Sequence, residues 1–98
     1  MRVIVSGTYA YVLFVFNTGI SVYRLDLATL AAPVSVLGIT DPYLNLTKFD
    51  AVIGTPSGGV STLYVLYETS TPDVVVRSYT VSTMASVASV SLARSGLV

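Results

Sequence analysis

The feature that most constrains this chain is an approximate internal repeat. Residues 10–12 (Ala-Tyr-Val) match residues 63–65 (Leu-Tyr-Val) at an offset of 53. After one inserted residue, 27–30 (Leu-Ala-Thr-Leu) match 81–84 (Val-Ser-Thr-Met) at an offset of 54. Each copy reads as strand, turn, apolar strand, polar turn, strand, turn and strand. A repeat of about 50 residues with four strands is typical of a β-propeller blade.

Short runs of strand-forming residues lie between turn signals along the whole chain. Val, Ile, Thr and Tyr are abundant, and their branched or aromatic side chains suit a pleated sheet. Lys and Glu, which are common on exposed helices, occur once each. Clusters of Gly, Pro, Asn, Asp and Ser separate the runs, as in an antiparallel meander. We therefore predict an all-β fold with strands at 2–6, 9–16, 20–27, 34–39, 43–53, 62–68, 74–81 and 87–92.

The repeat divides the predicted fold into two four-stranded antiparallel modules that resemble propeller blades. The first covers residues 1–40 and the second covers 41–98, with an insert at 51–60 ahead of the second Leu-Tyr-Val. Both belong to one structural domain, because 98 residues allow one domain or a piece of one. Tyr11 and Tyr64 occupy the apolar strand of each copy, and we expect them in the core.

The order of these motifs resembles the blades of YVTN-type and related β-propellers. Ala-Tyr-Val or Leu-Tyr-Val opens a strand, a polar turn follows, and residues 20–26 or 74–80 form the next strand. The resemblance covers nearly the whole chain. It implies a scaffold with surface, binding or assembly roles and without fixed catalytic residues. Asp26 becomes Thr80 in the second copy, so the chain departs from the pattern and the type of blade stays open.

Two blades do not close a propeller, which needs about 4–8. A free two-blade unit exposes strand edges and apolar faces, and both promote pairing with other chains. Copies of this chain are therefore the expected partners. Two, three or four copies would give about 4, 6 or 8 blades in a closed ring, and head-to-tail addition would give a filament. Two alternatives stay open: an assembled β-sandwich whose sheets are the matched halves, and a monomeric β domain.

Composition argues against several other functions. The chain has no His and no Cys, which removes the usual general base, thiol nucleophiles and the commonest metal ligands. We expect no enzyme activity, no cofactor and no metal site. Five basic and five acidic groups are scattered along the sequence, so nucleic acid is not an expected partner. No apolar run approaches the roughly 18–20 residues of a transmembrane segment, and no signal peptide is seen.

The charged fraction is 10% and the hydrophobic fraction is 53%, so most of the surface is expected to meet further copies of the chain. The main functional prediction is a non-enzymatic, self-assembling structural module, a subunit of a ring, particle or filament. The composition favours an extracellular or particle surface without fixing the compartment. A third interpretation is a fragment of a longer propeller.

Tyrosine is the residue type best suited to recognition, because its ring stacks on sugars and its hydroxyl forms hydrogen bonds. The alternative function is therefore a lectin-like module that binds carbohydrate. The tyrosines predicted to be exposed, as ligand or interface residues, are Tyr9, Tyr23, Tyr43, Tyr67 and Tyr79.

Overall fold

The computed structural model describes residues 1–16, 19–41, 44–55, 59–70 and 73–93. Within these residues the regular secondary structure consists entirely of β-strands. The strands are β1 (Arg2–Ser6), β2 (Tyr9–Phe16), β3 (Gly19–Asp26), β4 (Val34–Thr40), β5 (Leu44–Gly54), β6 (Thr62–Thr69), β7 (Asp73–Thr80) and β8 (Ala85–Ala93). All eight predicted strands are confirmed, with ends shifted by at most two residues.

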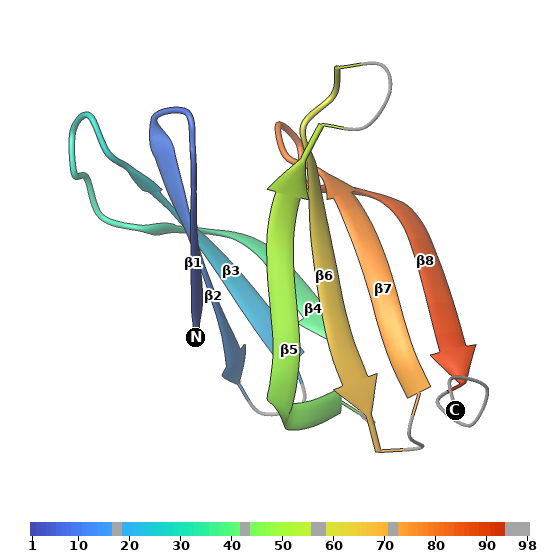
Figure 1. Ribbon diagram of the computed structural model, residues 1–98. Helices are drawn as coiled ribbons and strands as arrows, with labels where there is room; N and C mark the ends of the chain where they lie inside the picture. The colour runs from blue at the N-terminus through green and yellow to red at the C-terminus, as the bar shows by residue number, and fades with distance from the viewer. Residues whose placement is uncertain (17–18, 42–43, 56–58, 71–72, 94–98) are drawn as a thin grey trace. The chain divides into compact units, whose positions relative to one another are not determined.

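The strands form two antiparallel four-stranded sheets, ordered β1-β2-β3-β4 and β5-β6-β7-β8 (Figure 1). Each strand pairs with its neighbour in sequence, which makes both sheets simple meanders. The chain divides into two compact units, Met1–Pro42 and Tyr43–Val98, each containing one sheet. The first four residues of the predicted insert, 51–54, belong to strand β5, in keeping with the strand predicted over 43–53.

The internal repeat is present in the strands themselves. Strands β2 and β6 are both eight residues long and begin 53 residues apart. Strands β3 and β7 are also eight residues long and begin 54 residues apart. The offsets read from the sequence therefore describe the two central strands of each sheet.

The turn after the third strand of each unit repeats in atomic detail. The amide of Leu30 donates to the carbonyl oxygen of Asp26 at 2.8 Å, and the amide of Met84 donates to that of Thr80 at 2.6 Å. Leu30 has φ 52° and Met84 has φ 57°, the left-handed region that large side chains rarely adopt. The same strained turn thus closes both meanders at equivalent positions.

A second pair of hydrogen bonds ties each turn to the loop before the central strand. The amide of Leu27 donates to the oxygen of Thr8 at 2.8 Å, and the amide of Val81 donates to the oxygen of Ser61 at 3.1 Å. Thr8 and Ser61 precede β2 and β6 by one residue each. The repeat therefore extends from the strands to the connections between them.

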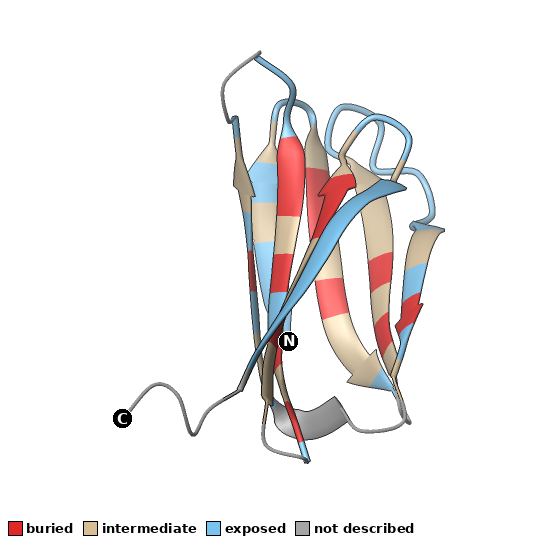
Figure 2. Ribbon diagram, turned by 90° about the vertical axis from the view of Figure 1, so that its right-hand side faces the viewer, coloured by how far each residue is buried: buried red, intermediate tan, exposed pale blue. Residues whose placement is uncertain are grey.

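The core of the first unit lies on one face of its sheet. Leu13 pairs with Val22, and Ile20 pairs with Ile39, so these side chains point to the same side. All four are buried, as is Tyr11, whose core location is confirmed (Figure 2). Burying one such aliphatic side chain stabilises a fold by about 1.5–3 kcal/mol.

The core of the second unit is built around β6. Leu63, Val65 and Tyr67 alternate along this strand and point to one side. Ala51 on β5 pairs with Val65, and Val75 on β7 pairs with Tyr67. All five are buried.

The two units bury opposite faces of the repeat. Leu13 is 0% exposed, whereas Leu66, its equivalent 53 residues later, is 37% exposed. Phe14 is half-buried, whereas its equivalent Tyr67 is buried. This change of buried face between the two units explains why Tyr64, predicted in the core, is only half-buried.

Candidate functional site

The tyrosines predicted to be exposed do not form one set. Tyr67 is 1% exposed and Tyr79 is 5% exposed, so that prediction is wrong for both. The register explains it, because Tyr79 pairs with buried Leu63 and Tyr67 lies on the same face of β6. Tyr9 and Tyr23 are half-buried. Tyr43 lies outside the described residues.

Tyr23 belongs to an apolar hollow on the first unit. Its ring stacks on Phe14 with centroids 5.5 Å apart and planes 10° from parallel. The hollow has a volume of about 420 Å³ and is lined by Val12, Phe14, Tyr23 and Pro33. Alternation along β2 places Val12 and Phe14 on one face, opposite the Leu13 face. The lining offers apolar carbon and one hydroxyl, so the hollow suits an apolar side chain.

Tyr9 lies on the other face of the same sheet, beneath an arginine. The guanidinium carbon of Arg24 is 4.7 Å from the centre of the Tyr9 ring, within cation–π range. Tyr9 also contacts Tyr11, with ring centroids 6.4 Å apart. Burial raises the pKa of the Tyr11 hydroxyl, and the positive charge of Arg24 partly opposes that rise. Arg24, Tyr9 and Tyr11 therefore pack together across β2 and β3, at one end of the core face.

A second arginine–tyrosine pair occupies the second unit. The Nε–H of Arg77 donates to the Tyr67 hydroxyl at 2.9 Å, and the guanidinium carbon lies 6.0 Å from the ring centre. The hydrogen bond to Tyr67 raises the pKa of Arg77, burial opposes the rise, and Tyr79 adds to it. The sequence analysis missed this pair, because pairing between β6 and β7 is needed to bring the two side chains together.

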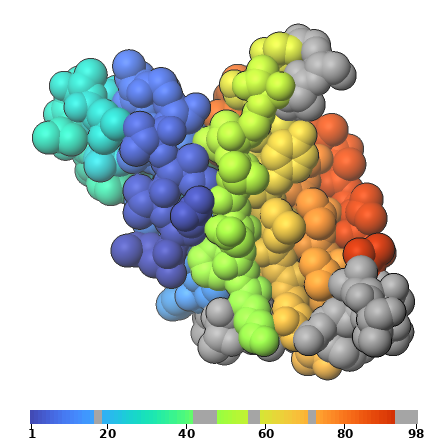
Figure 3. All heavy atoms as spheres, viewed as in Figure 1, coloured from blue at the N-terminus to red at the C-terminus, as the bar shows by residue number. Residues whose placement is uncertain are grey.

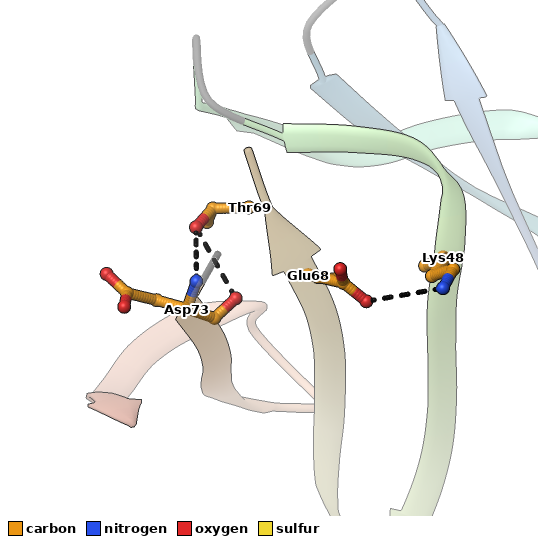
Figure 4. A network of polar contacts seen from close by, with 4 residues as sticks. All are labelled: Lys48, Glu68, Thr69 and Asp73. Carbon is orange, nitrogen blue, oxygen red and sulfur yellow. Dashed lines mark hydrogen bonds and ion pairs between the residues drawn. The ribbon is translucent and has the colours of Figure 1, made fainter. Parts of the chain in front are cut away.

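An ion pair and a pair of hydrogen bonds lie near the end of β6 in the second unit. Lys48 Nζ lies 3.7 Å from a carboxylate oxygen of Glu68 (Figure 4). The Asp73 amide donates to the Thr69 hydroxyl at 2.9 Å, and that hydroxyl donates to the Asp73 carbonyl oxygen at 3.4 Å. Lys48 is largely exposed, so its ion pair contributes no more than about 1 kcal/mol. The ion pair joins β5 to β6, and the two hydrogen bonds join the end of β6 to the start of β7.

The first and last strands of the chain expose apolar side chains. On β1, Val5 is 64% exposed and Val3 is also exposed. On β8, Val90 is 59% exposed, and Val87 and Leu92 are exposed as well. In the space-filling view β8 runs along one edge of the second unit (Figure 3). Both are edge strands, and edge strands normally carry charges that prevent pairing with other chains.

Charge protection of these two edges is minimal. Strand β1 contains one charged residue, Arg2, and β8 contains none. Among the described strands, none pairs with the outer side of β1 or of β8. These outer sides and the exposed valines therefore form a surface on which another strand can add. We call β1 and β8 the open edges.

Over the ranges that the structure describes, no three acidic side chains lie close enough to hold a metal ion. The described part of the chain also has no helix that is long and apolar enough to cross a membrane. Comparisons with protein-family models, with curated proteins and with solved structures find nothing that matches this chain.

Proposed function

We propose that this chain is a non-enzymatic structural module that assembles with copies of itself through its open edges. The observation that carries the proposal is the row of exposed apolar side chains on β1 and β8, where protective charge is nearly absent. Natural monomeric sheets protect their edges with charges, proline or covering segments. Edges left open in this way are suited to pairing.

The energetics require both side-chain burial and strand pairing. The exposed open-edge residues are roughly half exposed, so covering five of them contributes on the order of 5 kcal/mol. Association costs about 4–15 kcal/mol in lost freedom. Burial alone does not reliably offset that cost. Strand addition along the nine residues of β8 would form about four hydrogen-bonded residue pairs, or about eight backbone hydrogen bonds, each worth about 1 kcal/mol.

The proposal includes both assemblies expected from the repeat, a propeller-like ring similar to YVTN-type blades and an open filament. Pairing of β1 of one copy with β8 of the next joins two unlike edges. Such pairing is head-to-tail, so it can continue from copy to copy until a ring closes or a filament grows.

Sedimentation velocity over a wide range of protein concentration tests the proposal, with electron microscopy to distinguish rings from filaments. We expect assemblies larger than one chain. A Val5→Lys or Val90→Lys substitution should shift the distribution toward the single chain, because a charge is placed on an open edge. Ser82→Lys adds the same charge in an exposed turn and should leave the distribution unchanged. A compact single chain at all concentrations refutes the proposal.

The lectin-like alternative has less support. Tyr67 and Tyr79 are buried, while Tyr9 and Tyr23 lie on opposite faces of one sheet. The predicted tyrosines therefore do not offer one stacking surface for a neutral sugar. A glycan array probed with the assembled protein tests this alternative directly.

A further inference from the structure

Arg77 lies in a part of the second sheet that is partly open to solvent. It pairs with Val65 on β6 and with Ser89 on β8, so the three side chains point to the same side. Val65 is buried, Arg77 is half-buried and Ser89 is exposed. The guanidinium therefore lies where the core face gives way to an accessible surface.

The contacts of the guanidinium leave some of its donors for a ligand. Arginine has five N–H donors in a planar fork. The Nε–H is used by the Tyr67 hydroxyl, and the Tyr67 ring lies 6.0 Å from the guanidinium carbon. Tyr79 also forms a side-chain hydrogen bond with Arg77. The two terminal nitrogens carry four N–H bonds between them, so donors remain for the oxygens of a carboxylate. Tyr67 acts as the positioning residue for the guanidinium.

Arg77 has no acidic partner among the described residues. Its interactions there are with tyrosines, Tyr67 and Tyr79. Lys48, the other cation of this unit with a described side chain, is paired with Glu68. A cation that is partly removed from water and lacks a counter-charge attracts an anion.

Hydroxyl groups lie beside this guanidinium in a row along β8. Ser89 is directly opposite Arg77, Ser91 is opposite Val75, and Ser86 is opposite Tyr79. All three serines are exposed. Residues two apart in a strand are separated by about 6.6 Å, and adjacent strands by about 4.8 Å, which is the scale of a sugar ring. In the first unit, the β4 residue opposite Arg24 is Val34, which has no hydroxyl.

We propose that Arg77 and the neighbouring β8 serines form a binding site for a hydroxylated carboxylate of the uronic-acid class. The terminal guanidinium nitrogens bind the carboxylate, and Ser89 and Ser91 bind ring hydroxyls. Every group involved belongs to the second unit, and Ser89 and Ser91 lie on the open edge β8, so ligand binding and strand addition share this strand.

Saturation-transfer difference NMR tests the site, with glucuronate as the probe and glucose and acetate as comparison ligands. The method observes the ligand, so the protein is used in whatever assembly it forms. We expect saturable glucuronate signals, no saturable glucose signals, and acetate binding that is several-fold weaker than glucuronate binding. Equal binding of glucuronate and glucose, or of glucuronate and acetate, would overturn the proposal.

Variants identify the residues. Arg77→Gln should weaken glucuronate binding about tenfold or more, because charge-assisted hydrogen bonds are lost. Arg77→Lys should weaken it less, since the charge stays but the fork is lost. Arg24→Gln removes the matching arginine–tyrosine pair of the first unit and should have no effect. Ser89→Ala, at an exposed position, should weaken glucuronate binding and leave acetate binding unchanged.

The interpretation does not depend on one variant being folded. If circular dichroism shows that Arg77→Gln disrupts the sheet, Arg77→Lys and Ser89→Ala decide the question. Glucuronate binding at wild-type strength in both of these variants would refute the site.

Discussion

Equivalent leucines of the two repeats should differ sharply in their contribution to stability. Leu13 is 0% exposed and Leu66 is 37% exposed, although they occupy the same position in the repeat. Leu13→Ala removes about three carbons from a closed core and leaves a cavity, which costs about 2–5 kcal/mol. Leu66→Ala loses about two-thirds of the same transfer free energy, about 1.5 kcal/mol, and leaves no closed cavity. The expected difference is about 0.5–3.5 kcal/mol.

Urea unfolding followed by circular dichroism measures both free energies of unfolding. The experiment is carried out in the Val90→Lys background at low protein concentration, so that assembly does not add to the measured stability. If Leu13→Ala is too unstable to fold, Leu13→Val and Leu66→Val provide the same comparison with smaller changes.

Equal losses for the two leucines, or a larger loss at Leu66, would refute the opposite-face interpretation of the repeat.

Three further predictions concern single positions. Leu30→Gly or Met84→Gly should raise the free energy of unfolding by about 0.5–1 kcal/mol, because relief of the left-handed strain exceeds the added entropy of glycine; thermal unfolding measures it. Gly19→Ala should destabilise by about 1–3 kcal/mol, because its Cβ would lie 2.6 Å from a backbone oxygen, whereas Gly38→Ala has open space and should be neutral. Because burial raises the pKa of Tyr11, the folded state holds the hydroxyl proton more tightly than the unfolded state does. This stabilisation of the fold is complete below pH 10.0 and is lost as the pH rises above that value. Tyr11→Phe should remove this part of the pH dependence of the free energy of unfolding, measured by urea unfolding at alkaline pH.

The strands were predictable because their signals are local. Alternation, β-branched residues and turn clusters lie within each segment, and they set the strand ends to within two residues. The sequence match between residues 27–30 and 81–84 includes the strained turn at Leu30 and Met84, but it does not predict the left-handed backbone of these two residues. The two matched tetrapeptides, Leu-Ala-Thr-Leu and Val-Ser-Thr-Met, share only their Thr, yet both adopt this geometry.

The buried faces were not predictable, because β2 and β6 are apolar on both sides. In β6 both Tyr64 and Tyr67 fit an apolar strand, and only the register of the folded sheet distinguishes the half-buried ring from the buried one. The Arg77–Tyr67 contact was missed for a related reason. The residues are ten positions apart and meet only when β6 pairs with β7 in one particular register.

The meander order has a consequence for how the chain is made. Every strand pairs with the strand that precedes or follows it, so the average contact spans a short stretch of sequence. Low contact order speeds folding, because little chain entropy is lost before pairing begins. The first sheet has all four of its strands by Thr40 and can therefore form on the ribosome while the second sheet is still being synthesised. Nascent chains on one messenger would then present completed sheets close to one another, and a subunit could meet its first partner during translation.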